Sequence, residues 1–259
     1  MNKDSKISLV IDSTSRYSDA WPMFFGQLLK FFPAEISGYL FTDMVPPAFT
    51  FPAEKPEIIC YDNRESYRNQ IVGCLKNVQT DYIIYNSEDY ILYDFVRLDL
   101  MKSLVSALEK DPDFSFVKLI KGPEATSPYK DFPFLHVIDP QDPNLFAQQA
   151  SIWRTADFLA VFEASPSSYG RMDLEPQGSD TCRRIGIKGL QYFEGSERKR
   201  GLFHWDSKAY PITATAITKG KWNILEYKEE LSKLAAEYET NLGERGTNAP
   251  SYMDYIIKI

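Results

Sequence analysis

Residues 7–16 read ISLVIDSTSR, an apolar run that ends in an acid and continues into a polar turn. A compact apolar run of this length is typical of a buried strand. Aromatic and aliphatic side chains then recur at helical spacing from Tyr17 to Phe32, with Pro22 near the first turn, where a helix tolerates it. The stretch therefore predicts a strand, a polar loop and a helix, in that order.

The same alternation continues along the chain. The segment DYIIY at residues 81–85 predicts another buried strand, and an amphipathic helix over residues 98–108 follows it. Strands that alternate with helices are typical of a mostly parallel sheet with helices on both faces, so we predict an α/β fold. Further strands are expected at residues 36–41, 57–61, 114–120, 149–154, 190–193 and 212–217, and further helix faces at residues 71–78, 156–162 and 231–242.

Polar side chains follow three of the predicted strands, at residues 12–16, 62–63 and 88–89. In a parallel sheet these positions belong to the carboxyl ends of the strands, which meet at one edge. Ligands bind at that edge in open α/β sheets. We therefore expect these residues to converge on a binding site.

The composition excludes several classes of protein. The chain has 29 Lys+Arg and 36 Asp+Glu, so 29 − 36 gives a net charge of −7, and no nucleic-acid partner is expected. Three cysteines without a CxxC pair argue against a disulfide framework and a structural zinc site. The two histidines are too few for a His-rich metal site.

The sequence predicts one domain over residues 1–225, with a C-terminal helix and tail over residues 226–259 packed on it. It has no apolar run near the ~18 residues of a transmembrane segment and no signal-peptide pattern at its N-terminus. A cytoplasmic protein is the simplest expectation, with peripheral association with the membrane as an option.

Four segments, taken in order, resemble a family of GT-A-type glycosyltransferases found among enzymes of bacterial and viral surface-polysaccharide biosynthesis. They are VIDSTSRYSDAWPMFF, DYIIYNSEDYILYDF, QQASIWRTADFL and MDLE, at residues 10–25, 81–95, 148–159 and 172–175. Each segment is short, and their order carries the match, which extends to residues 220–222. The resemblance implies a single Rossmann-like GT-A domain that binds a UDP- or GDP-type sugar donor and transfers the sugar to a glycan or glycolipid acceptor.

The resemblance also implies a role for the acidic pair after the strand at residues 81–85. Asp89 takes the position of the final carboxylate of a DxD-like motif, which binds a divalent cation, Mn²⁺ or Mg²⁺, on the donor diphosphate. Carboxylate oxygens suit these cations. Ser87 stands where a strict DxD has its first acid, which puts metal dependence in question, and Glu88 is expected to contact the donor ribose or the metal. The alternative is a solvated turn that begins the next helix.

Later in the chain, His204 is a candidate metal or diphosphate ligand, since a neutral imidazole can serve as either. Arg198, Lys199 and Arg200 precede it, and their charges could neutralise a leaving nucleoside diphosphate. The alternatives are an ordinary core or surface histidine and a solvated basic loop.

Glu175 matches the position of the catalytic base in the resembling enzymes, at the start of a helix after the W-R strand. Inverting transfer needs a carboxylate that deprotonates the acceptor hydroxyl. Asp173 is the second choice for this role. A helix start also suits an acid that only caps the helix, and a retaining mechanism would need no such base.

On the donor side, Thr14, Arg16 and Asp62 are expected to contact the base and ribose of the nucleotide. On the acceptor side the candidates are Trp153 and Arg154, although a tryptophan in a strand is more often part of the core.

Two other functions compete with sugar transfer. A nucleotidyltransferase would need a Gly-rich phosphate loop after the first strand, and residues 13–16 contain no glycine. A non-catalytic protein that binds nucleotide sugars on the same fold is compatible with the missing strict DxD.

Overall fold

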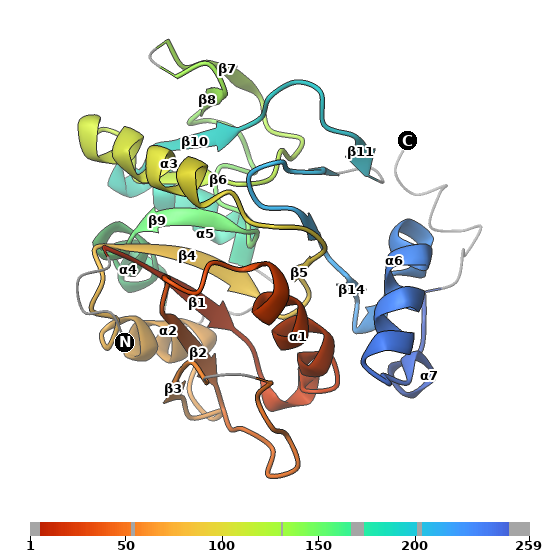
Figure 1. Ribbon diagram of the computed structural model, residues 1–259. Helices are drawn as coiled ribbons and strands as arrows, with labels where there is room; N and C mark the ends of the chain where they lie inside the picture. Colours follow the sequence, from red (N-terminus) through yellow and green to blue (C-terminus); the bar gives the residue numbers. More distant parts are fainter. Residues whose placement is uncertain (1–5, 53–54, 131, 167–173, 201–203, 249–259) are drawn as a thin grey trace.

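The computed structural model describes residues 6–52, 55–130, 132–166, 174–200 and 204–248 (Figure 1). Asp173, the second choice for a catalytic base, lies outside these residues. The helices are η1 (Ser15–Tyr17, a 3-10 turn), α1 (Trp21–Phe31), α2 (Tyr67–Leu75), α3 (Leu98–Lys110), α4 (Thr155–Ala164), α5 (Leu174–Ile185), α6 (Ile224–Glu237) and α7 (Leu242–Arg245).

The strands form one large sheet and three small pairs. The sheet has the order β3 (Glu57–Cys60), β2 (Gly38–Thr42), β1 (Ile7–Asp12), β4 (Tyr82–Ser87), β9 (Ser151–Arg154), β6 (Phe116–Lys118), β10 (Gly189–Tyr192), β8 (Leu135–Ile138) and β7 (Thr126–Pro128). The pairs are β5 (Ile91–Leu92) with β13 (Ile212–Thr213), β11 (Lys199–Arg200) with β12 (His204–Trp205), and β14 (Ile217–Thr218) with β15 (Lys221–Trp222).

Most strands of the sheet run in one direction. β3, β2, β1 and β4 are parallel neighbours, and β10 is parallel to β6. β9 runs antiparallel to both of its neighbours, β4 and β6. The predicted α/β class, with a mostly parallel sheet, is confirmed.

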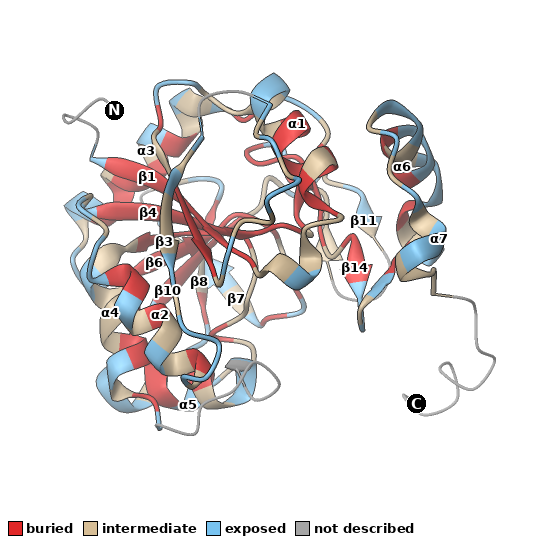
Figure 2. Ribbon diagram, turned by 90° about the horizontal axis from the view of Figure 1, so that it is seen from below, coloured by how far each residue is buried: buried red, intermediate tan, exposed pale blue. Residues whose placement is uncertain are grey.

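Alternate residues of β1 enter two separate cores, as expected for a sheet that is buried on both faces. Leu9 packs with residues of α1 and α3, and Val10 packs with residues of α2, α4 and α5. Figure 2 shows the buried strands between the two helical layers. The predicted helices on both faces are therefore present.

The C-terminal part of the chain differs in detail from the sequence prediction. The strand expected at residues 212–217 is split into β13 and β14, because Thr215 has a φ of 59° that breaks the extended backbone. The C-terminal helix α6 begins at Ile224, so the expected domain boundary after residue 225 falls within its first turn. Among the described residues, no helix has the length and apolarity to cross a membrane.

The C-terminal helix lies against α1. A Cβ atom added to Gly26 of α1 would lie 2.1 Å from a ring carbon of Tyr238, which directly follows α6, so only glycine permits this approach. Lys30 of α1 also forms an ion pair with Glu237 at the end of α6.

Candidate functional site

Asp43 organises the loop between β1 and α1. It follows β2 directly, and its carboxylate accepts hydrogen bonds from the Ser15 backbone N–H (2.6 Å), the Ser15 hydroxyl (2.7 Å) and the Thr14 hydroxyl (3.1 Å). The Asn63 amide adds a fourth, at 2.8 Å. Although burial alone would raise the pKa of Asp43, these bonds hold it well below its usual value. The loop that contains Thr14 is thus fixed to the carboxyl ends of β2 and β3.

Asp12, the last residue of β1, is fully buried beneath this loop. Its Oδ2 accepts hydrogen bonds from the hydroxyls of Tyr67 (2.6 Å) and Tyr85 (2.9 Å), and the Gln148 amide lies 3.5 Å away. Buried carboxylates require such donors. Asp12 therefore forms part of the floor of the site and does not face a ligand.

The segment after β4 forms a tight turn, in which the Tyr90 N–H donates to the Ser87 carbonyl at 3.1 Å. Glu88 is buried and Asp89 is half-buried. The Ala216 N–H donates to the Asp89 carbonyl at 2.8 Å, so the C-terminal segment supports this turn. The predicted solvated turn is therefore wrong for Glu88.

Arg245 of α7 reaches back to the start of α1. Its Nε donates to Asp19 at 2.8 Å, a second guanidinium nitrogen pairs with the same carboxylate, and Nη2 donates to the Arg16 carbonyl at 3.2 Å. The guanidinium also lies over the rings of Tyr17 (4.4 Å to the centroid) and Trp222 (5.9 Å). Although burial lowers the pKa of Arg245, its bonds to Asp19 raise it above the usual value. Arg245 joins the C-terminal extension to the loop that carries Arg16, whose own side chain is exposed.

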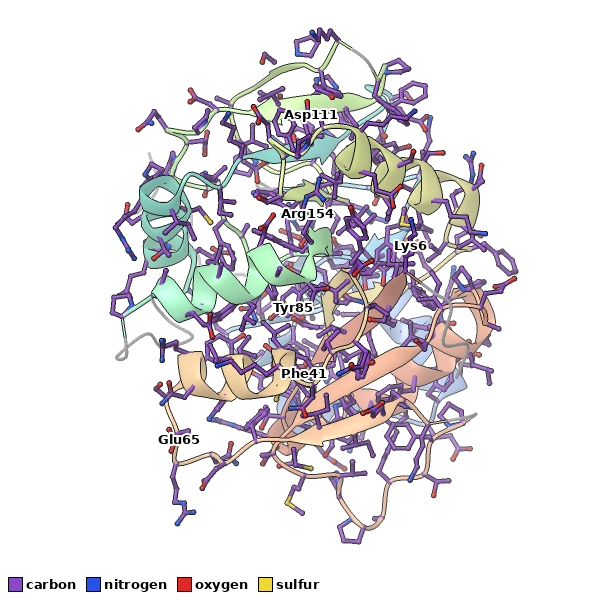
Figure 3. The ribbon with its side chains drawn as sticks, turned by 90° about the vertical axis from the view of Figure 1, so that its left-hand side faces the viewer. Lys6, Phe41, Glu65, Tyr85, Asp111 and Arg154 are labelled. Atoms are coloured by element: carbon purple, nitrogen blue, oxygen red, sulfur yellow. The ribbon has the colours of Figure 1, made fainter. Side chains whose placement is uncertain are left out.

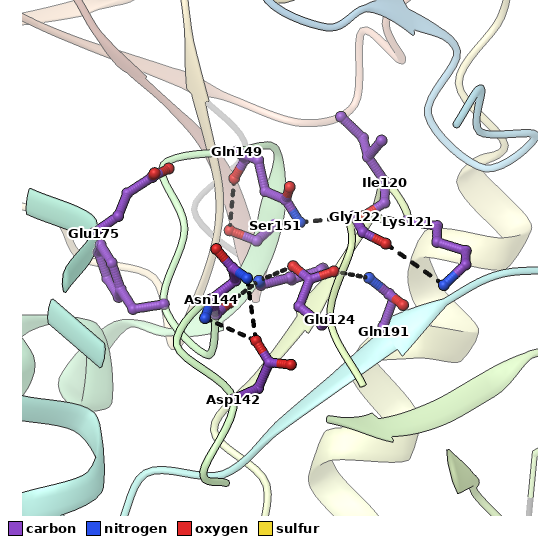
Figure 4. Close-up of polar contacts among 12 residues, drawn as sticks. Ile120, Lys121, Gly122, Glu124, Asp142, Asn144, Gln149, Ser151, Glu175 and Gln191 are labelled. Carbon is purple, nitrogen blue, oxygen red and sulfur yellow. Dashed lines mark hydrogen bonds and ion pairs between the residues drawn. The ribbon is translucent and has the colours of Figure 1, made fainter. Parts of the chain in front are cut away.

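Glu175 lies in the first turn of α5, and its Oε1 accepts a hydrogen bond from the Gln148 N–H at 3.1 Å. Two residues spaced four apart along the same helix also bind the loop of residues 142–148: Ser179 pairs with the backbone of Phe146, and Arg183 donates to the Asp142 carbonyl. Glu175 is exposed, and its Oε1 bonds a neighbouring loop rather than its own helix. Figure 4 shows Glu175 on one side of this loop.

A buried ion pair lies on the other side of the 142–148 loop (Figure 4). Lys118, at the carboxyl end of β6, pairs with Glu124 and donates to the Asn144 carbonyl, and both charged side chains are 1% exposed. The Gln191 amide donates to the second oxygen of Glu124 at 2.9 Å. The loop is therefore bound on both sides.

Tyr90 connects the turn after β4 to the 142–148 loop. The Tyr90 hydroxyl donates to the Gln148 carbonyl at 2.6 Å, and the N–H of Gln148 donates to Glu175. Burial raises the pKa of Tyr90, and the nearby carboxylates of Asp89 and Glu175 raise it further. Asp89 and Glu175 thus lie on the same edge of the sheet, on either side of Tyr90.

Asp62 binds its neighbour Arg64. It is exposed, and its carboxylate binds the guanidinium and N–H of Arg64, which lower its pKa. The expected convergence of polar residues on the Thr14 loop comes instead from Asp43, which follows the neighbouring strand β2 and binds the Thr14 hydroxyl. The rule that found Asp62, an acid after a strand, would also have found Asp43.

The cationic residues before His204 contact other side chains of the protein. The Nε atoms of Arg198 and Arg200 lie 3.3 and 2.9 Å from the two oxygens of Asp206. Lys199 lies over the Trp205 ring, 5.1 Å from its centroid. The alternative of a fully solvated loop is wrong for Arg200, whose side chain is 13% exposed, whereas the side chain of Arg198 is 64% exposed.

His204 is packed against α6. Its Nε2 lies 2.6 Å from the Tyr227 hydroxyl and 3.5 Å from Glu226, and burial lowers its pKa to about 4. Within the described part of the chain, no group of three or more His, Cys, Asp or Glu side chains could hold a metal ion. The structure therefore does not bring Asp89 and His204 together with a third such ligand.

Trp153 and Arg154 lie away from this edge. Trp153 is 2% exposed and stacks on Phe116 at 4.1 Å between ring centroids. Arg154 pairs in register with Tyr82 at the amino end of β4, and its guanidinium donates to the Phe114 carbonyl (Figure 3). The expectation that these two residues contact an acceptor is corrected, because β9 carries them to the core and to the opposite edge.

Comparisons with known proteins give fold-level likenesses. No family model and no curated protein matches the chain. Among solved structures, S. aureus TarS 1–349 is 12% identical with a TM-score of 0.49, over 77% of this chain and 60% of that chain. CMP:2-keto-3-deoxy-manno-octonic acid synthetase complexed with CTP is 13% identical with a TM-score of 0.41, over 73% and 89%. The bifunctional IspDF of Campylobacter jejuni is 13% identical with a TM-score of 0.45, over 76% and 52%.

All three TM-scores lie below 0.5, and the chain spans less than two thirds of the TarS and IspDF chains. These likenesses concern the fold alone.

Proposed function

We propose that this chain is a GT-A-type glycosyltransferase that moves a sugar from a nucleotide-diphosphate-sugar donor to a hydroxyl group of a glycan or glycolipid. The observation that carries the proposal is the pair of carboxylates around Tyr90. Asp89 belongs to the turn after β4, beside the loop that Asp43 fixes, and Glu175 approaches from α5. One acid is suited to the donor and the other to the acceptor.

Glu175 has the features of a general base. Its Oε1 is oriented by the Gln148 N–H, and the residue is otherwise exposed, so an acceptor hydroxyl can reach the carboxylate. As the acceptor oxygen bonds to the anomeric carbon, Glu175 would take its proton, and the nucleoside diphosphate would leave with the electron pair of the broken carbon–oxygen bond. This direct displacement inverts the anomeric configuration. Arg200 is bound by Asp206, and the exposed side chains of Arg16, Arg198 and Lys199 are cations suited to the donor phosphates.

A nucleotidyltransferase is less well supported. The N–H groups of Ser15, Tyr17 and Ser18, which follow the first strand, all donate to acceptors within the protein. A cradle for a nucleoside triphosphate needs backbone N–H groups that point at the phosphates.

The first test is a thermal-shift panel of UDP, GDP, CMP and dTDP sugars, with and without Mn²⁺, because a ligand of the folded state raises Tm. A divalent cation held by Asp89 and the donor phosphates is part of the proposal, and the metal arm of the panel tests it. Absence of any shift would contradict the proposed function.

The second test is Glu175→Gln, which should keep donor affinity and lose sugar transfer by about 10²–10⁴-fold. The matched control is Glu163→Gln on α4, where the exposed Glu163 pairs with Lys76 at 2.9 Å. Near-normal transfer by Glu175→Gln would rule out the base, and a large loss of donor affinity would mean that the pocket had been damaged.

A further inference from the structure

The contacts of Gln148 join the two acidic residues of the site through one backbone position. The carbonyl of Gln148 accepts from the Tyr90 hydroxyl at 2.6 Å, and its N–H donates to Glu175 at 3.1 Å. Tyr90 directly follows Asp89 in the chain. A shift of the turn after β4 would therefore be transmitted to Glu175 through two hydrogen bonds.

The rest of the 142–148 loop is already held in place. Ser179 and Arg183 bind it from α5, and Lys118 binds the Asn144 carbonyl from β6. At its end, the Gln148 side chain reaches the hydroxyls of Tyr67 (3.4 Å) and Tyr85 (3.3 Å). The bond from Tyr90 joins this loop directly to the residue that follows Asp89.

Tyr90 is suited to this role because it is 6% exposed, and its hydroxyl is directed at a backbone carbonyl.

We propose that Tyr90 is a positioning residue that fixes Glu175 relative to the Asp89 turn through the backbone of Gln148. The inference rests on the proposed function, in which these two acids serve the acceptor and the donor. Because a misplacement of about 1 Å can cost about 10²-fold in rate, the hydroxyl of Tyr90 should matter for turnover although it contacts neither substrate.

The first experiment compares Tyr90→Phe with Tyr82→Phe. Tyr82 is also buried, and its hydroxyl accepts from Arg154 at 3.0 Å at the opposite edge of the sheet. With the nucleotide sugar that gives the largest thermal shift, Tyr90→Phe should lower kcat by about 10- to 100-fold and leave donor KM within about twofold. Tyr82→Phe should change neither. Equal kcat values in the two variants would overturn the proposal.

The second experiment needs no activity. Unfolding temperatures are measured for Tyr90→Phe, Glu175→Ala and the double variant. Since both side chains act on Gln148, the double variant should lose less than the sum of the two single shifts. Additive shifts would overturn the link. If the unaltered chain transfers no sugar, the proposed function fails, and this cycle still decides whether Tyr90 is coupled to Glu175.

Discussion

Replacement of Lys118 by Met should be among the most destabilising single changes that this fold allows. Lys118 and Glu124 are both 1% exposed, and Met matches the lysine stem in length. The change would leave a buried carboxylate with the Gln191 amide, and the Asn144 carbonyl would lose its ammonium partner. Glu124 has little room to turn away, because a Cβ atom at Gly122 would lie 2.5 Å from its Oε2.

The expected magnitude follows from the loss of one partner of a buried pair, which costs about 3–5 kcal/mol. A chain of this size shifts its Tm by about 2–4 °C per kcal/mol, so a drop of about 6–20 °C is expected. Lys118→Met combined with Glu124→Gln should recover a large part of this loss, because the uncompensated charge is gone. Lys76→Met is the control: Lys76 pairs with Glu163 on the surface, and its side chain is 57% exposed. Its effect should stay within about 0.5 kcal/mol.

Urea denaturation of the unaltered chain and of four variants gives the free energies of unfolding: Lys118→Met, Glu124→Gln, the double variant and Lys76→Met. The reasoning would be refuted if Lys118→Met behaved like Lys76→Met. It would also be refuted if the double variant were as unstable as the sum of Lys118→Met and Glu124→Gln. An additive result would mean that the two groups do not interact as a buried pair.

Three further predictions concern donor binding, pH and the C-terminal extension. Asp89→Asn should weaken Mn²⁺-dependent donor binding in calorimetry. The same change at the exposed Asp81, before the amino end of β4, should leave donor binding unchanged. Equal donor affinities of the two variants would exclude a metal-binding role for Asp89. For His204 the folded pKa of about 4 lies below the usual 6.5, so its contribution to the free energy of unfolding is full above pH 6.5 and falls by up to about 3 kcal/mol as pH drops toward 4. The free energy of unfolding of His204→Gln, measured against pH, should lack this part of the pH dependence. An unchanged pH dependence would contradict the lowered pKa of His204. Arg245→Lys cannot keep both hydrogen bonds to Asp19 or the planar group that stacks on Tyr17. The change should lower the free energy of unfolding by about 2 kcal/mol in urea titrations and weaken donor binding. A decrease below about 0.5 kcal/mol would mean that α7 does not fix the first loop.

The order of strands and helices could be predicted because each unit carries its own pattern. ISLVID and the YIIY of residues 82–85 are buried on both faces in the structure, as their continuous apolar runs indicated. The prediction failed at residues 212–217, where the positive φ of Thr215 interrupts an apolar stretch that otherwise resembles a strand. Backbone conformation at a threonine is set by its tertiary contacts, and periodicity does not report it.

The site was harder to predict because its contacts join distant parts of the chain. Arg245 binds Asp19 across 226 positions, and no local pattern announces such a pair. The run of Arg198 to Arg200 has the composition of a phosphate-binding loop, yet Asp206 pairs with both of its arginines. A charge run gives the sign of a surface, and only the fold decides whether an opposite charge lies beside it.

The antiparallel strand β9 explains both what the site gained and what it lost. A strand that runs against its neighbours begins at the edge where they end. Ser151, the first residue of β9, is in register with Tyr85 near the carboxyl end of β4 and with Lys118 at the end of β6. The loop before β9 must therefore reach the carboxyl edge, which brings Gln148 between Tyr90 and Glu175. For the same reason the end of β9 must lie at the opposite edge, so Arg154 could not have faced a ligand bound beside Asp89. One reversal of strand direction thus supplies the backbone that orients the proposed base and removes the residues first assigned to the acceptor.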